Sequence, residues 1–110
     1  MRYAEYFIES DDGRIIETND VKLWSATPRK HVGDDTVGGY RVSTVFLGTD
    51  HGFGAPGGPV LYETMLFGEG PHDQYCDRYH KRDEAAAAHA RICAALADGS
   101  FRGYQAEVSE

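Results

Sequence analysis

The sequence predicts an α+β fold: an antiparallel sheet of five to six strands built from hairpins, with one C-terminal helix packed on one face. Two observations carry this prediction. Over the first eighty residues, short segments rich in β-branched and aromatic residues alternate with turn signals that contain Gly, as in a series of hairpins. Residues 83–98 then read DEAAAAHARICAALAD, and alanine is the best helix former. From the length of 110 residues we expect a single domain, 1–110, with its core in residues 1–99.

A first hairpin is expected from residues 3–9 and 14–18, which are rich in aromatic and β-branched side chains. The turn between these two segments contains Asp12-Gly13. This dipeptide favours the positive φ angles that a tight hairpin turn requires.

A short helix is expected near residues 20–27. Asn19 or Asp20 can cap its N-terminus, because their side chains accept hydrogen bonds from the free N–H groups of the first turn. The helix must end before Pro28, because proline disfavours helical geometry in the residue that precedes it. We expect Trp24 to anchor this helix to the sheet.

Residues 29–37 are predicted to be the first strand of a second hairpin and an edge of the sheet. Charged side chains and Gly33 are typical of strands that must resist further pairing. Gly38-Gly39 is a favourable turn dipeptide and leads into the next strand at residues 40–47.

The strand at residues 40–47 also forms a central hairpin with residues 60–67, and a twelve-residue loop rich in Gly and Pro joins them. We interpret this loop as a flexible lid, because it lacks the following helix and the Lys-Ser/Thr ending of a phosphate-binding loop. If Leu47 pairs with Val60, Glu63 lies on an apolar face of the sheet. A carboxylate there must be paired, hydrogen-bonded or neutralised.

The last elements are a turn at residues 68–74, a strand at residues 75–80 and the C-terminal helix. Asp83 is the expected N-cap of that helix and Gly99 its C-cap. The tail, 100–110, can form a final strand, act as a docking arm or be disordered. Helical spacing places on the sheet-covering face Ala85, His89, Ile92, Cys93 and Leu96.

The charge, hydropathy and cysteine content of the chain argue against several classes of function. The net charge of −7 argues against binding of long nucleic acids, which requires a basic surface. No apolar run approaches the roughly 18 residues of a membrane helix. Cys76 and Cys93 lie 17 residues apart without metal-binding spacing, so we expect no disulfide, no metal and no cofactor, and a cytoplasmic location.

Several blocks between residues 40 and 90 resemble a family of small uncharacterised proteins from phages and prophages of GC-rich bacteria. The blocks are VSTVFLG-x-DH at residues 42–51, ETM-x-F at residues 63–67 and EA-x-x-x-H at residues 84–89. The resemblance implies a small phage accessory protein, which would act in the cytoplasm of the host cell, and implies no specific activity.

The candidate catalytic residues are Asp50, His51, Glu63 and His89. A His after a strand, a desolvated Glu on the adjoining strand and a second His on the covering helix would suffice for general acid/base chemistry. The structural alternative is that Asp50 forms an Asx turn, that His51 bonds to the backbone, and that Glu63 and His89 satisfy each other between sheet and helix. The sequence leaves both open.

A second candidate site is the basic segment 78–82, which lies immediately before a helix N-terminus, where backbone N–H groups favour anions. Tyr75 and Tyr79 could stack on a base there. The alternative is a solvated edge strand that uses charge against aggregation. The candidate ligand-binding residues are Arg78, Tyr79, Lys81, Arg82, His51 and Phe53.

We expect a small phage-type accessory protein that binds a ligand, such as a nucleotide-like signal, or a host factor; a role in host-defence evasion is what the resemblance and the small size imply. The alternative is a small phosphodiesterase-like hydrolase that uses His51, His89 and Glu63 as acid/base groups. We also expect a homo-oligomer, because Phe101 and Tyr104 and the short sheet edges leave apolar surface that a small monomer covers poorly.

Overall fold

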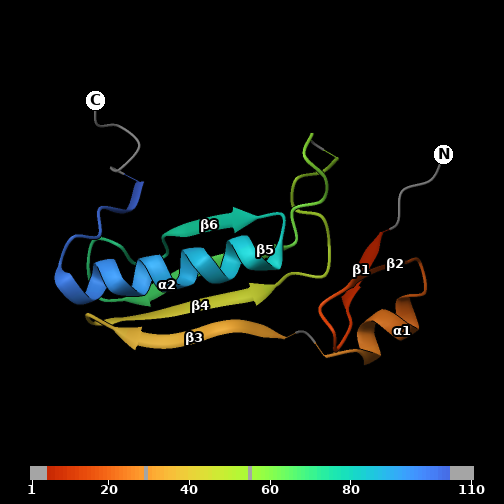
Figure 1. Ribbon diagram of the computed structural model, residues 1–110, viewed down its shortest axis with the longest axis horizontal. Helices are drawn as coiled ribbons and strands as arrows, with labels where there is room; N and C mark the ends of the chain where they lie inside the picture. Colours follow the sequence, from red (N-terminus) through yellow and green to blue (C-terminus); the bar gives the residue numbers. More distant parts are fainter. Residues whose placement is uncertain (1–4, 29, 55, 105–110) are drawn as a thin grey trace.

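The computed structural model describes residues 5–28, 30–54 and 56–104, and they form two antiparallel sheets and two helices (Figure 1). The α+β class predicted from the sequence is therefore confirmed. The strands are β1 (Tyr6–Glu9), β2 (Ile15–Thr18), β3 (His31–Val37), β4 (Tyr40–Phe46), β5 (Tyr62–Gly68) and β6 (Cys76–Tyr79). The helices are α1 (Val21–Ala26) and α2 (Arg82–Asp98).

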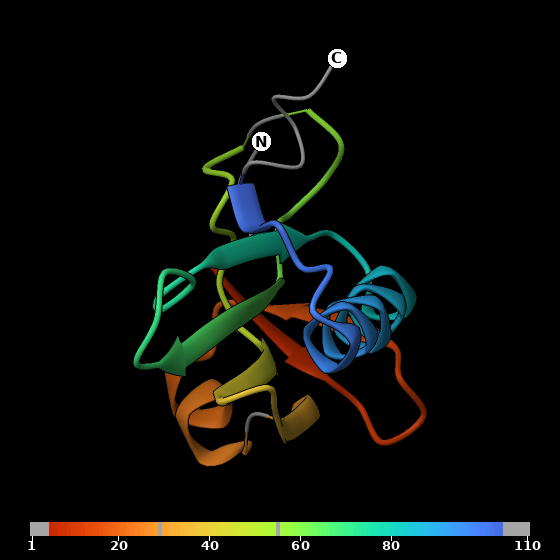
Figure 2. The same ribbon diagram turned by 90° about the vertical axis from the view of Figure 1, so that its left-hand side faces the viewer.

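The larger sheet has the strand order β3-β4-β5-β6, and α2 covers one of its faces (Figure 2). The predicted edge position of β3 and the predicted turn at Gly38-Gly39 are confirmed, and both glycines have positive φ angles, 59° and 87°. The opposite face of this sheet is not covered by α2. We call the face on which α2 packs the covered face, and the opposite face the uncovered face.

The prediction of one continuous sheet is wrong, because β1 and β2 form a separate two-stranded sheet beyond the end of β4 (Figure 1). The chain leaves β4 at Gly48, whose φ of 82° turns it out of the strand direction. β1 then meets the central hairpin through the hydrogen bond from the Phe7 N–H to the Gly48 carbonyl (2.9 Å). Trp24 anchors α1 at the same point, because its indole N–H donates to that carbonyl (3.1 Å).

The register of the central hairpin differs by one residue from the prediction. Leu47 donates its N–H to the carbonyl of Leu61 instead of pairing with Val60. In this register the buried side chains of β4 and β5 share the covered face, and Glu63 lies opposite Val45 on the uncovered face. A slip of one residue would move the buried side chains of Tyr62 and Leu66 to the opposite face of the sheet.

The core lies between α2 and the larger sheet and extends to β1. Its buried apolar side chains come from β1, from the larger sheet and from α2: Phe7, Ile8, Tyr40, Val42, Phe46, Leu61, Tyr62, Leu66, Tyr79, Ala85, Ala88, Ile92 and Leu96. The predicted buried face of α2 is confirmed, with Cys93 half-buried at its margin. No helix among the described residues is long and apolar enough to cross a membrane.

The N-cap of α2 lies two residues earlier than the sequence indicates, so the predicted N-cap at Asp83 is wrong. Lys81 occupies the N-cap position with an extended backbone. The carboxylate of Glu84 accepts the N–H groups of Lys81 (3.2 Å) and His80 (3.3 Å), which satisfies donors that the helix itself leaves free. The predicted C-cap is confirmed, because Gly99 has a φ of 80°.

The first part of the tail packs against the edge strand β6. The hydroxyl of Tyr104 accepts the N–H of Cys76 (2.8 Å) and donates to the carbonyl of the same residue (3.1 Å). These are backbone groups of an edge strand, so Tyr104 covers part of this edge. The rest of the predicted tail, residues 105–110, lies outside the described residues.

Candidate functional site

His89 on α2 is buried and is held by a chain of polar side chains that crosses the sheet. Its Nδ1 atom lies 2.8 Å from the hydroxyl of Thr44 on β4. That hydroxyl bonds to Thr64 on β5, which in turn accepts a hydrogen bond from the Tyr79 hydroxyl on β6 (3.2 Å). Both threonines are fully buried. The imidazole is therefore fixed in one orientation between helix and sheet.

The backbone of β3 makes room for this imidazole at Gly33. A Cβ atom at position 33 would lie 2.5 to 2.7 Å from three atoms of the His89 ring, closer than any side chain tolerates. The strand pairing is irregular here, with a register shift between His31 and Gly33. The glycine is thus explained by the close approach of His89, in addition to its place in an edge strand.

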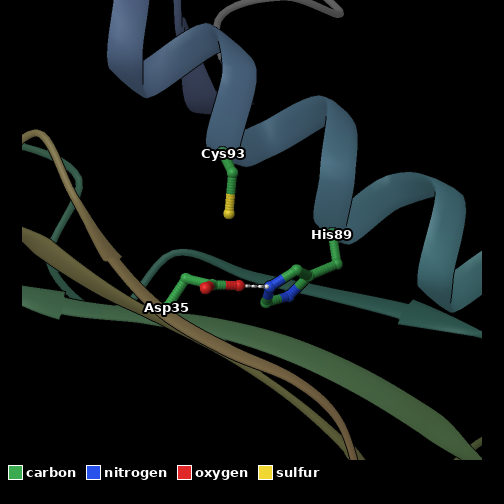
Figure 3. Close-up of side chains that lie close together, drawn as sticks. All are labelled: Asp35, His89 and Cys93. Carbon is green, nitrogen blue, oxygen red and sulfur yellow. Dashed lines mark hydrogen bonds and ion pairs between the residues drawn. The ribbon is translucent and has the colours of Figure 1, made fainter.

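Asp35 and Cys93 complete a cluster of three polar side chains around the outer nitrogen of the ring (Figure 3). The carboxylate of Asp35 on β3 lies 2.7 Å from His89 Nε2. Cys93 lies one helical turn after His89 and points toward the same carboxylate (Figure 3). One donor atom from each of the three side chains lies within 4.8 Å of the other two.

The cluster does not have the arrangement of a cysteine nucleophile with its base. Both ring nitrogens of His89 are already engaged, by Thr44 and by Asp35, so neither is free to take the thiol proton. Burial, and to a lesser extent the charge of Asp35, raises the pKa of the Cys93 thiol. A raised pKa lowers the fraction of reactive thiolate. The arrangement is suited to holding a group rather than to attacking one.

Asp50 and His51 have the structural roles that the sequence left open as the alternative. Asp50 accepts the N–H groups of Gly52, Gly54 and Val60 at 2.7 to 3.0 Å, and so closes the base of the loop. Burial acts to raise the pKa of Asp50, but these hydrogen bonds outweigh it and hold the pKa below its usual value. His51 bonds through Nδ1 to the backbone carbonyl of Thr49 (3.1 Å).

Phe53 lies in the same loop and is 90% exposed. Its φ angle of 53° lies in the left-handed region, which few residues other than Gly adopt. The loop therefore presents a large apolar ring to solvent.

Glu63 lies on the uncovered face of the sheet, so the alternative in which Glu63 and His89 satisfy each other is wrong. Its carboxylate accepts hydrogen bonds from the Arg78 guanidinium (3.0 Å) and the Cys76 thiol (3.3 Å). Burial and the neighbouring carboxylate raise the pKa of Cys76 to about 11. The structure places the candidate catalytic residues in three separate places: the loop, the uncovered face and the covered face.

The candidate ligand-binding residues of the basic segment 78–82 also lie in different places. Arg78 bonds to Glu63 on the uncovered face, and the Tyr79 side chain is buried in the core. Arg82 donates to both carboxylate oxygens of Glu9 (2.8 and 3.0 Å), and this tie joins α2 to the first hairpin. Lys81 is exposed. These residues do not form one anion-binding patch.

A cleft lies at the other end of α2, between residues 71–75 and residues 99–104; we call it the C-terminal cleft. It consists of two adjoining cavities of about 270 and 360 Å³. Both cavities are lined by Pro71, His72 and Arg102. The first is lined also by Asp73, Tyr75, Gly103 and Tyr104, and the second also by Gly99, Ser100 and Phe101.

The walls of the C-terminal cleft are held by backbone hydrogen bonds and by contacts between aromatic rings. On one side, the N–H of Gln74 donates to the Leu66 carbonyl (2.7 Å), and on the other, the N–H of Phe101 donates to the Ala95 carbonyl (3.1 Å). The rings of Tyr75 and Tyr104 have centroids 4.6 Å apart. Among the residues that the structure describes, the Arg102 guanidinium has no hydrogen-bond or ion-pair partner.

Sequence reasoning missed Asp35, Cys93 and the C-terminal cleft as parts of a site. The four-residue spacing of His89 and Cys93 was a usable signal, because residues four apart lie on one face of a helix, whereas the sequence was interpreted as having no Cys/His spacing of a metal site. Asp35 lies on an edge strand with an irregular register, so its position relative to the helix could not be derived. The cleft depends on a turn and a tail without periodicity.

Comparison of the chain with protein-family models, with curated proteins and with solved structures finds no match.

Proposed function

We propose that the protein is a binding protein that takes a small planar anion of the nucleotide class in the C-terminal cleft. The observation that carries this proposal is the guanidinium of Arg102, exposed and without a partner among the described residues, at the junction of two cavities. A guanidinium pairs with phosphate through two parallel hydrogen bonds. In a chain with a net charge of −7, this guanidinium supplies positive charge to both cavities.

The aromatic rings that line the cleft with Arg102 would bind the base of the nucleotide. Tyr104 is 61% exposed and lies against Tyr75, and Phe101 meets Tyr75 edge to face, with centroids 5.1 Å apart. A base that stacks on an aromatic ring gains about 1–3 kcal/mol without sequence-specific hydrogen bonds. The carboxylate of Asp73 also lines the cleft, but it accepts the N–H of Gly68 (3.0 Å) and so is held by its own turn.

The hydrolase alternative receives no support from the geometry. His51, Glu63 and His89 lie in three separate places, so no substrate atom could be within reach of all three. A general acid and a general base must both lie within hydrogen-bonding distance of the reacting group. The binding proposal needs only the groups that the C-terminal cleft brings together.

A titration with nucleotides tests the proposal. We would measure binding of nucleoside monophosphates and cyclic nucleotides by calorimetry for the unaltered protein, Arg102→Gln and Arg91→Gln. Arg91 lies exposed on α2 and is the matched control, because it has the same charge outside the cleft. We expect Arg102→Gln to weaken binding by at least tenfold and Arg91→Gln by less than twofold. Equal affinity of the two variants, or no binding at millimolar ligand, would contradict the proposal.

A partner protein is the second candidate, and Phe53 is the observation that favours it. The phenyl ring of Phe53 is 90% exposed, and the residue has a positive φ angle, which is unfavourable for a side chain of this size. Large aromatic side chains of this kind dominate the energetics of protein interfaces. If a host protein is captured by the unaltered chain and not by Phe53→Ser, while nucleotides fail to bind, this candidate replaces the first.

A further inference from the structure

We propose that Asp35, His89 and Cys93 form a binding site for a divalent transition metal ion of the zinc class. The three side chains offer a carboxylate oxygen, an imidazole nitrogen and a sulfur, and these are the donor types that zinc takes in proteins. They converge from two elements, β3 and α2, with their donor atoms within 4.8 Å of one another (Figure 3). The site is independent of the C-terminal cleft.

The spacing of the donors fits an ion after a small movement. Metal–ligand bonds of about 2.0–2.3 Å in tetrahedral geometry place ligand atoms about 3.4 Å apart. The Asp35 oxygen now lies 2.7 Å from His89 Nε2, so the ion would take the place of this hydrogen bond and separate the two atoms. Asp35 can move, because its side chain is 59% exposed and lies on an edge strand.

The surroundings of His89 are those of a metal ligand. A ligating histidine usually donates its second ring nitrogen to a neighbouring acceptor, which fixes the ring orientation. Thr44 stands at that position, 2.8 Å from Nδ1, and is itself held by Thr64. Gly33 leaves the ring room against the backbone. The nitrogen that faces Asp35 and Cys93 is therefore the one that would bind the ion.

Cys93 is positioned to be the third ligand. It lies four residues after His89, and side chains at this spacing share one face of a helix. The thiol must lose its proton to bind, and a bound cation favours the thiolate even where burial opposes it. The exposure of Asp35 leaves one side of the cluster open to solvent, where water can be the fourth ligand, as in three-ligand zinc sites.

Cobalt(II) is a suitable probe for this site, because its absorption spectrum reports both a bound thiolate and four-coordinate geometry. Metal-free protein would be titrated with cobalt(II) chloride. We expect a sulfur-to-cobalt charge-transfer band and intense visible bands, and we expect zinc to displace them. Cys93→Ser should abolish the charge-transfer band, and Asp35→Asn should weaken cobalt binding by at least tenfold.

Cys76 supplies the control, because it is the second thiol of the chain and lies on the opposite face of the sheet, on β6. Cys76→Ser should leave the cobalt spectrum unchanged. Alkylation mapped by mass spectrometry gives a second readout that does not depend on any variant folding: zinc should protect Cys93 and leave Cys76 as reactive as before. Absence of the cobalt bands, their persistence in Cys93→Ser, or equal labelling of Cys93 with and without zinc would each overturn the proposal.

Discussion

The imidazole of His89 lies against the backbone of Gly33 so closely that a Cβ atom there would come within 2.5 Å of Nε2. The two residues are 56 positions apart in the chain, and their contact closes α2 on the edge of the sheet. The contact also explains a glycine within a strand, where this residue is unfavourable.

We therefore predict that Gly33→Ala destabilises the protein by about 2 kcal/mol, because overpacking at a close contact costs about 1–3 kcal/mol. Chemical denaturation measures the change. In a His89→Ala background, Gly33→Ala should lower the free energy of unfolding by less than half as much, because the imidazole ring is gone. The difference between the two losses is the coupling energy of Gly33 and His89. An equal cost in both backgrounds would show that Gly33 does not accommodate His89.

The ion pair between Glu9 and Arg82 should be worth more than the pair between Glu63 and Arg78. The Glu9 side chain is 1% exposed, whereas that of Glu63 is 15% exposed. Removing one partner of a buried pair leaves a charge without compensation. We expect Arg82→Gln to cost about 2 kcal/mol in the free energy of unfolding. Arg78→Gln, the control, should cost about 0.5 kcal/mol, as for exposed pairs. Similar losses in both variants would contradict this ranking.

Asp50 should stabilise the loop only while it is ionised. Its pKa in the folded protein lies below the ordinary value of 3.8, so its contribution is complete above that value and is lost as the pH falls through the lower folded value. We expect Asp50→Ala to lower the free energy of unfolding by about 2 kcal/mol between pH 5 and 7, because hydrogen bonds to a charged group are lost. The loss should shrink below pH 4. Denaturation across this range measures it, and a loss independent of pH would be the contrary outcome.

Cys76 should react slowly with alkylating reagents. Its pKa of about 11 lies above the ordinary thiol value, so at pH 8 the thiolate is about 100-fold scarcer than in a free cysteine. In a Cys93→Ser background, we expect the alkylation rate to keep rising through pH 10, and Glu63→Gln to increase the rate at pH 8. A rate that levels off near pH 9 would show that Glu63 and burial do not control this thiol.

The elements were predictable because each carries a local signal. Asp20 caps α1 through its side chain, Gly38-Gly39 forms the turn between β3 and β4, and the alanine-rich segment forms α2. The arrangement of the strands in sheets was not predictable, because it depends on how the chain turns at Gly48 after β4.

The candidate sites were less predictable than the fold. A register shift of one residue moves Glu63 to the other face of the sheet, and the sequence alone does not fix it. The expected homo-oligomer stays a prediction. Exposed aliphatic side chains on the first hairpin and α1 provide apolar surface for it: Ile15, Ile16, Val21 and Leu23.

The central claim, ligand binding in the C-terminal cleft, is tested most directly by following backbone amide signals in an NMR titration with a nucleoside monophosphate. The account predicts that the signals of residues 72–75 and 99–104 shift together and saturate at one dissociation constant, while those of α1 and the loop around Phe53 stay unchanged. Saturating shifts confined to residues 78–84, or no shifts at millimolar ligand, would contradict it.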